Sequence, residues 1–403
     1  MNILFYCNEY PPYKTGGIGT VTKIVAEALA KRGHNIYIVG YYPSNTTLPE
    51  YSEINGVHVY RYNLGYQCGK IRKLLFQLFY KLHCTRHIIQ KELSFTERKI
   101  SELIEQKRIQ IIELTDFYKF NAQSSGILNY TKFPVPTVLR VHGSASFLKS
   151  LQGITNQTIK TNDSRHFNRC EHISAVSEYS LKYVQENFDM AHFKTQSVIY
   201  NPIEERFLNP TPPSNSNDIL FIGKLTKAKG CYSLLEAFNI CAEKYPDMQL
   251  RLAGNGDIEK AKSYVKPQFI DRVHFLGFCN REQIQKEIDH CAFACIPSFF
   301  ETFGMVALEI MGRQRALIFT ERTSGKEIIN DGENGYLINP ENIDDIAKKI
   351  EILFSNNSLK KKIASNAFHS VQKFSTSKII NQLENYYTNI IHNDTQNCKK
   401  NKK

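Results

Sequence analysis

Short apolar runs alternate with segments of helical periodicity along nearly the whole chain. A first series of predicted strands lies at 2–7, 35–39, 110–114, 137–141, 172–176 and 197–200. A second series lies at 219–223, 249–253, 273–276, 292–297, 316–320 and 336–338. Between most of these runs the apolar residues follow the helical period, which predicts amphipathic helices. Such alternation with short connections is typical of parallel sheets built from right-handed βαβ units.

Two consecutive series predict two α/β domains, each a Rossmann-like, doubly wound sheet, that face each other across a cleft. A stretch rich in Pro, Ser and Asn at 209–217 separates the series and suits an interdomain linker. We expect an N-terminal domain over residues 1–205 and a C-terminal domain over residues 206–375. Residues 376–392 are expected to form a helix that packs back toward the N-terminal domain, and 393–403 a disordered basic tail.

Composition and charge narrow the class of protein. Of the 403 residues, 42% are hydrophobic and 22% are charged, which excludes collagen-like, disordered and disulfide-scaffold proteins. Lys and Arg number 51 against 39 Asp and Glu, and the net charge of +12 favours a partner that carries phosphate, nucleic acid or anionic lipid. The first residues lack the basic region of a signal peptide, and no apolar run is long enough to span a bilayer. We therefore expect a soluble, cytoplasmic protein.

Loops after predicted strands are candidates for chemistry, because ligands bind parallel sheets at the carboxyl ends of the strands. One such loop contains Gly16, Gly17 and Gly19 and opens a helix, whose free N–H groups favour an anion. A tight turn without a ligand is the alternative there. A second loop contains Lys224 and Lys229, which either act as cations toward a ligand or stay solvated.

A pair of glutamates carries the most specific pattern. Glu301 and Glu309 stand eight residues apart, the first in a loop after a predicted strand and the second inside the next helix. Carboxylates accept hydrogen bonds from vicinal hydroxyls, and a helix start near Phe303 and Gly304 offers N–H donors to phosphates. Two solvated glutamates on a surface helix are the alternative, which explains poorly a carboxylate within an apolar helix. His142, at another strand end, is either structural or catalytic, and we favour catalysis.

Taken in this order, the motifs resemble the retaining, nucleotide-sugar-dependent glycosyltransferases of family 4, which have the GT-B fold. The resemblance runs from Asn2 to about Asn381 and includes the E-x7-E signature from Glu301 to Glu309. It implies an acceptor-side N-terminal domain and a nucleotide-sugar-binding C-terminal domain. It also implies transfer of a hexose-type sugar from a nucleotide diphosphate to a glycan or lipid-linked acceptor, in the biosynthesis of a bacterial capsule, O-antigen or exopolysaccharide.

The same resemblance implies roles for individual residues. Lys224 and Lys229 would neutralise the leaving diphosphate. Glu301 would hold hydroxyls of the donor sugar, Glu309 would hold the ribose, and His142 would touch the sugar near the reacting carbon. His142, Lys229 and Glu301 are thus the expected catalytic residues. The other implied donor-binding groups are Gly16, Gly17 and Gly19 over the phosphates, Gly277 and Phe278 at the base, and the main-chain N–H groups of Phe303, Gly304, Met305 and Val306.

We expect the transfer to need no metal and no cofactor besides the nucleotide-sugar co-substrate. The sequence contains no Asp-x-Asp motif that would cage a metal ion on a diphosphate. The charge of the leaving group would then fall to lysines and helix-start N–H groups. One departure from the family lies at 323–327, where a Gly-Gly pair is usual before the glutamate.

The segment 69–87 bears on the acceptor. It contains five Lys and Arg residues, no acidic residue, and interleaved Leu and Phe. It is either a helix that lies on an anionic membrane, at the inner face of the plasma membrane, or a buried helix with a solvated basic edge. Nucleic acid is disfavoured as a partner, since no recognised binding motif accompanies the charge. Two other functions stay open: a sugar-nucleotide epimerase or phosphorylase of the same architecture, and a non-catalytic nucleotide-sugar-binding subunit.

Overall fold

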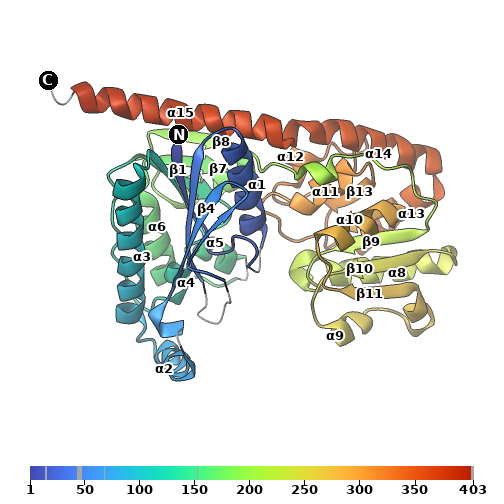
Figure 1. Ribbon diagram of the computed structural model, residues 1–403. Coiled ribbons are helices and arrows are strands. Elements are labelled where there is room, and N and C mark those ends of the chain that lie inside the picture. Colours follow the sequence, from blue (N-terminus) through green and yellow to red (C-terminus); the bar gives the residue numbers. More distant parts are fainter. Residues whose placement is uncertain (14–15, 43–47, 68, 152, 401–403) are drawn as a thin grey trace. The chain divides into compact units, whose positions relative to one another are not determined.

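The computed structural model describes residues 1–13, 16–42, 48–67, 69–151 and 153–400, and it divides into two compact units (Figure 1). Unit 1 comprises Met1–Pro202 together with the chain from Thr376 onward, and unit 2 comprises Ile203–Ser375. The division falls close to the domain boundary predicted after residue 205. Each unit is a doubly wound α/β sheet, which confirms the predicted fold class.

In the described part of unit 1, eight strands form one sheet in the order β3-β4-β2-β1-β5-β6-β7-β8. Neighbouring strands are parallel except for the antiparallel pair β3–β4. The strands with buried residues on both faces lie at the centre, as is usual for parallel sheets covered by helices. Their bounds are β1 (Asn2–Tyr6), β2 (Asn35–Tyr42), β3 (Tyr51–Ile54), β4 (Val57–Asn63), β5 (Ile111–Thr115), β6 (Thr137–Val141), β7 (His172–Ala175) and β8 (Thr195–Val198).

The helices of unit 1 include the C-terminal helix α15 (Thr376–Lys400), which packs on the segment before β2. There Glu384 bonds Arg32 at 2.6 Å and His34 at 2.7 Å. The helix continues past Asn393, where the sequence predicted a disordered tail, because no Pro or Gly interrupts it before Lys400; residues 401–403 lie outside the described residues. The other described helical elements of unit 1 are α1 (Gly17–Lys31), η1 (Gly65–Gln67), α2 (Lys70–Lys81), α3 (Arg86–Lys107), α4 (Lys119–Gln123), α5 (Ala145–Ser150), α6 (Gln157–Asn168) and α7 (Glu178–Asn187).

Unit 2 contains a sheet of six described strands, all parallel, in the order β11-β10-β9-β12-β13-β14. Every residue of the central strand β9 (Asp218–Ile222) is buried. The other strands are β10 (Gln249–Ala253), β11 (Val273–Gly277), β12 (Phe293–Ile296), β13 (Ala316–Thr320) and β14 (Tyr336–Ile338). The helical elements are η2 (Glu205–Phe207), η3 (Lys227–Lys229), α8 (Cys231–Lys244), α9 (Ile258–Lys262), η4 (Pro267–Arg272), α10 (Arg281–His290), α11 (Met305–Gly312), α12 (Gly325–Ile328), α13 (Ile343–Ser355), α14 (Asn357–Val371) and η5 (Gln372–Phe374).

The stretch 209–217 is part of unit 2 and not a linker between the units. The buried Arg315 donates hydrogen bonds to the carbonyl oxygens of Thr211 and Pro212, at 3.3 and 3.0 Å. The Thr211 hydroxyl in turn donates to the carbonyl oxygen of Arg313 at 3.1 Å. A Pro-rich extended segment keeps its carbonyls unpaired, so it can serve as the acceptor surface for a buried guanidinium.

The strand orders fix where ligands should bind. In unit 1 the strand order reverses between the parallel strands β1 and β5, and in unit 2 it reverses between the parallel strands β9 and β12. A crevice opens at such a switch point, because the two connections leave toward opposite sides of the sheet. A ligand is therefore expected to bind at the loops that follow these four strands.

Candidate active site

Lys229 and Glu301 meet at the switch point of unit 2. Lys229 ends η3, which follows β9, and Glu301 lies in the loop after the neighbouring strand β12. The Lys229 Nζ atom lies 2.7 Å from Glu301 Oε1, which also accepts a hydrogen bond of 2.9 Å from the Ser298 hydroxyl. The side chains of Lys229 and Glu301 are 35% and 17% exposed, so a ligand can reach the pair. The structure thus brings together two of the three expected catalytic residues.

A glycine allows this approach. Gly230 has φ +70°, and a Cβ on it would lie 1.8 Å from the carbonyl oxygen of Pro297. The Phe299 N–H donates to the carbonyl oxygen of Ala228 at 3.0 Å, which ties η3 to the loop after β12. A larger residue at 230 would push the two loops apart and separate Lys229 from its carboxylate partner.

The loop that carries Glu301 is held from the segment after β13. The Glu301 N–H donates to the Thr323 hydroxyl at 3.1 Å, and the Ser324 hydroxyl donates to the Glu301 carbonyl oxygen at 3.4 Å. Thr323 has φ +57°, a left-handed conformation that a β-branched residue rarely adopts. This is the position at which the sequence departs from the glycine pair usual in the family.

Glu309 lies in α11 and is almost fully buried, with 3% of its side chain exposed. Arg281, at the start of α10, donates to Glu309 Oε1 at 2.7 Å and to Glu204 Oε2 at 2.8 Å. The same guanidinium stacks on the Phe207 ring at 4.6 Å. Burial raises the pKa of the Glu309 carboxyl, and the positive charge of Arg281 opposes that rise. The sequence pattern gave no signal for Arg281, because the pairing joins residues that are distant along the chain.

Helix α11 begins at Met305, two residues after the predicted start at Phe303. Gly304 caps it with φ +88°, and a Cβ there would lie 2.8 Å from the ring of Phe319. The N–H groups of Met305 and Val306 belong to the first turn, which has no helical acceptors for them, so they can bind an anion. The Phe303 side chain is buried against Phe374, and only its main chain remains a candidate for ligand contact.

The remaining predicted residues of unit 2 lie at other strand ends. Lys224 follows β9 and is exposed. Gly277 ends β11 with φ +67° and accepts a hydrogen bond of 2.8 Å from the Gly254 N–H. Phe278, directly after it, is 72% exposed, which leaves its ring accessible for stacking on a base.

In unit 1, the glycines at the start of α1 pack against Glu9, in the loop after β1. The Gly16 N–H donates to Glu9 Oε2 at 2.9 Å. A Cβ on Gly19 would lie 2.2 Å from the main-chain oxygen of Glu9, whereas Gly17 has open space around it. A carboxylate therefore already occupies part of the helix start that was predicted for an anion. Lys14 and Thr15, which belong to the same predicted loop, lie outside the described residues.

His142 follows β6, and the buried carboxylate of Asp116 holds its main chain. Asp116 Oδ1 accepts from the His142 N–H and Oδ2 from the Gly143 N–H, both at 2.8 Å. Burial raises the pKa of Asp116 to about 7, although these bonds oppose the rise. Burial, with a contribution from Arg140, lowers the pKa of His142 to about 3, so the imidazole is neutral at physiological pH.

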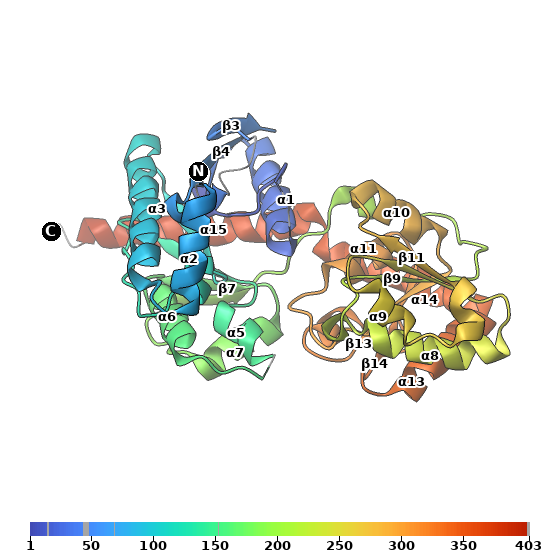
Figure 2. The same ribbon diagram turned by 90° about the horizontal axis from the view of Figure 1, so that it is seen from below.

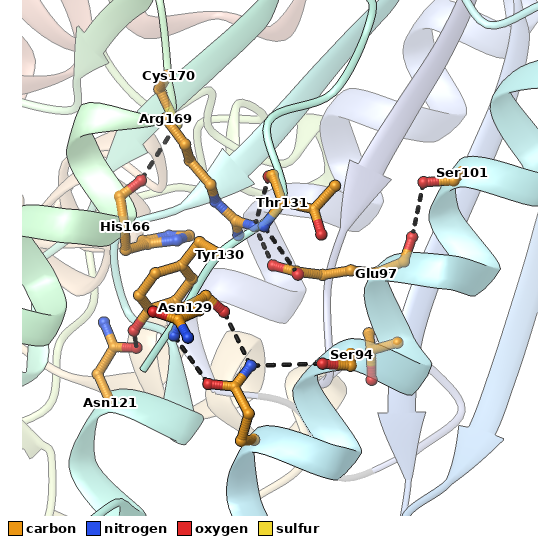
Figure 3. A network of polar contacts seen from close by, with 12 residues as sticks. Ser94, Glu97, Ser101, Asn121, Asn129, Tyr130, Thr131, His166, Arg169 and Cys170 are labelled. Carbon is orange, nitrogen blue, oxygen red and sulfur yellow. Dashed lines mark hydrogen bonds and ion pairs between the residues drawn. The ribbon is translucent and has the colours of Figure 1, made fainter. Parts of the chain in front are cut away.

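A buried polar network lies behind this loop (Figure 3). Asp163 accepts hydrogen bonds of 2.7 Å from the Ser146 N–H, four residues after His142, and from the Asn121 amide. Asn121 accepts from the Tyr130 hydroxyl at 2.7 Å, and Figure 3 shows the two side chains turned toward each other. Figure 3 also shows Arg169 paired with Glu97 beside Tyr130, whose ring lies 5.2 Å from the guanidinium. The Ser146 bond fixes the segment that carries His142 to α6, and the other contacts join α6 to α4 and to α3.

No group of three or more His, Cys, Asp and Glu side chains among the described residues is placed to hold a metal ion. No helix in this part of the chain is both long enough and apolar enough to cross a membrane.

Known families match the chain in two consecutive blocks. The model described as Glycosyltransferase Family 4 matches residues 15–207, and the model described as Glycosyl transferases group 1 matches residues 203–370. An uncharacterized glycosyltransferase of Methanocaldococcus jannaschii is 26% identical over 409 residues, covering 96% of this chain and 98% of that protein.

Solved structures share the fold. Sucrose-phosphate synthase from Thermosynechococcus elongatus superposes with a TM-score of 0.77 at 17% identity, over 97% of this chain and 99% of that one. The Anabaena protein HepE, in complex with UDP and glucose, superposes with a TM-score of 0.69 at 19% identity, over 96% of this chain and 99% of that one.

Proposed function

The chain belongs to the glycosyltransferases of family 4, with the GT-B fold, and from that premise we propose that it transfers a hexose-type sugar from a nucleotide diphosphate donor with retention of anomeric configuration. One observation carries the proposal: the Lys229–Glu301 pair stands at the switch point of unit 2. A cation beside a carboxylate suits a ligand that joins a diphosphate to a polyhydroxylated ring. The Anabaena HepE structure, with UDP and glucose bound, supports this class of donor.

The donor contacts follow from the chemistry of each group. Lys229, with Lys224 and the N–H groups that open α11, would take up the charge of the leaving diphosphate. Glu301 would exchange its bond to Lys229 for a bond from a sugar hydroxyl. Glu309, oriented by Arg281, would accept from the ribose. Gly277 and Phe278 would contact the base. The glycines at the start of α1 would contact the phosphates.

The reaction would proceed by attack of the acceptor hydroxyl on the same face from which the diphosphate leaves. The bond between the anomeric carbon and the diphosphate oxygen breaks as the bond to the acceptor oxygen forms. The acceptor proton passes to the departing phosphate oxygen, so atoms and charge balance without a protein nucleophile. His142 is neutral, so it can hydrogen-bond to the sugar without opposing the positive charge that develops on the ring.

We propose a glycan or a lipid-linked sugar as the acceptor, in the assembly of a bacterial surface polysaccharide. The net charge of +12 supports an anionic or membrane-associated acceptor. The activity would be located in the cytoplasm, where nucleotide sugars serve as donors.

A donor screen tests the function. UDP-, GDP- and ADP-sugars are added to the protein, and a rise in its melting temperature identifies the donor. Transfer is then measured as acceptor-dependent release of the nucleoside diphosphate, and NMR gives the anomeric configuration of the product. We expect retention and an unchanged rate with a chelator present. Donor conversion without an acceptor would indicate an epimerase, dependence on inorganic phosphate a phosphorylase, and binding without turnover a non-catalytic subunit.

A further inference from the structure

Helix α2 exposes an unusual number of large apolar side chains. Ile71, Leu74 and Leu78 are 76%, 68% and 50% exposed, and no residue of the helix is buried. The exposed apolar residues of the helix and its C-terminal cap are Ile71, Leu74, Leu75, Leu78, Phe79, Tyr80 and Leu82. The structure thus contradicts the alternative of a buried helix with a basic edge. A patch of this kind on a soluble protein marks an interaction surface.

The helix has one anchored side and one free side. The Phe76 ring stacks on Tyr66 with 4.1 Å between centroids, and the Tyr66 hydroxyl donates to Gln123 at 2.8 Å. Leu78, two positions after Phe76, lies on the opposite side of the helix at about 100° per residue. The exposed leucines therefore point away from the body of unit 1.

Basic residues border this free side. Lys70 and Lys81 lie one turn from Leu74 and Leu78, on one margin of the apolar stripe, and Arg72 lies one turn before Leu75 on the other. The sequence contains no Asp or Glu between Glu53 and Glu92. An apolar stripe with basic margins is the pattern of helices that lie in the interface of an anionic bilayer.

The helix also stands at the functional edge of its sheet. It follows the carboxyl end of β4, which is parallel to β2 and, through it, to β1, β5 and β6. The segments that carry Gly16 and His142 follow the carboxyl ends of β1 and β6 and so leave the sheet at the same edge. Figure 1 places α2 at the end of unit 1 opposite α15, and in Figure 2, which is seen from below, α2 lies in front of α15.

We propose that α2 docks on an anionic bilayer, with its leucine stripe among the acyl chains and its lysines at the lipid phosphates. Docking would bring the headgroup of a lipid-linked acceptor to the sheet edge that carries His142; this second part rests on the proposed function. A second copy of the chain fits the surface poorly, because a two-fold interface would oppose two identical basic margins with no acid between them. An anionic lipid surface complements both the charge and the apolar stripe.

Flotation of the full-length protein with vesicles tests the docking. Vesicles of phosphatidylglycerol and phosphatidylcholine in equal parts should retain the protein, and pure phosphatidylcholine should retain about tenfold less. Leu74→Ser/Leu78→Ser and Lys70→Glu/Lys81→Glu should each lower binding about tenfold. The matched controls are Ile258→Ser and Lys348→Glu/Lys362→Glu, which alter exposed residues of unit 2 and should bind like the wild type.

Equal binding of the α2 variants and the wild type would overturn the proposal. So would a loss of dimer in light scattering caused by the leucine variant, which would identify a second copy as the occupant. Far-ultraviolet circular dichroism checks that each variant is folded. Flotation needs no donor, so it tests membrane docking even if no sugar transfer is found. If transfer occurs, the α2 variants should keep the donor-induced rise in melting temperature and lose activity only toward a vesicle-bound acceptor.

Discussion

Arg281 donates a hydrogen bond of 2.7 Å to the buried carboxylate of Glu309, and its other Nη atom bonds Glu204. The residue proposed to hold the ribose is therefore oriented by a cation from a different helix. This relationship makes Arg281 a positioning residue for the donor site, although it is outside the E-x7-E signature.

Replacing Arg281 should weaken donor binding as well as stability. Arg281→Met leaves a buried carboxylate without its partner, which should lower the free energy of unfolding by about 2 kcal/mol. The loss is smaller than for a fully buried ion pair, because Arg281 is itself partly exposed. The pKa of Glu309 should rise further and its ionised fraction should fall, so KM for the donor should increase about tenfold. Urea unfolding and steady-state kinetics measure the two effects.

Arg251→Met is the matched control for this variant. Arg251 pairs with Glu287 at 2.7 Å in the same unit and has no contact with Glu309. Arg251→Met should lower the free energy of unfolding and leave KM for the donor unchanged. If both variants changed KM alike, the effect of Arg281 would be general destabilisation.

Lys229 should matter for the chemical step. Lys229→Met removes a cation proposed to stabilise the leaving diphosphate, so kcat should fall about 100-fold while the protein stays folded. Lys227→Met is the control, since Lys227 is exposed in the same short helix and should keep at least half of the wild-type rate. Turnover of donor and acceptor by both variants is the measurement. A normal kcat in Lys229→Met would remove Lys229 from the site.

The sequence predicted the parallel sheets well, because buried parallel strands are short continuous apolar runs. It missed the hairpin β3–β4. This pair is antiparallel at the edge of the sheet, and its strands mix polar with apolar residues. The Asn55–Gly56 turn between them, with φ of +50° and +79°, is a recognisable hairpin signal that could have found it.

The candidate site was only partly predictable. Glu301 and Lys229 follow neighbouring strands, so topology alone brings them together. Arg281 and Glu9 could not be inferred, because their pairing depends on how helix starts pack against distant loops. Pattern rules describe periodicity along the chain, and they do not describe which charged side chains meet across it.

The left-handed conformation of Thr323 yields a prediction on stability. Thr323→Ala loses the acceptor for the Glu301 N–H and keeps the unfavourable φ, so unfolding should become easier by about 1 kcal/mol. Thr323→Gly loses the same acceptor but relieves the backbone, so it should be about 1 kcal/mol more stable than Thr323→Ala. Urea unfolding of the three proteins compares them. A glycine variant less stable than the alanine variant would show that the backbone here is not strained.

The carboxyl of Asp116 should make stability depend on pH. Its pKa is raised from 3.8 to about 7 by burial, so between these values the folded protein binds a proton that the unfolded chain releases. The free energy of unfolding should therefore fall as pH rises from 4 to 7, by up to about 4 kcal/mol for this group at 1.36 kcal/mol per pKa unit. Asp116→Asn cannot ionise, so the difference between wild type and variant isolates the effect. Urea unfolding at pH 4.5, 6 and 7.5 measures it. If the free energy of unfolding of the wild type relative to Asp116→Asn stayed constant over this range, the two main-chain bonds would outweigh burial and keep Asp116 ionised throughout.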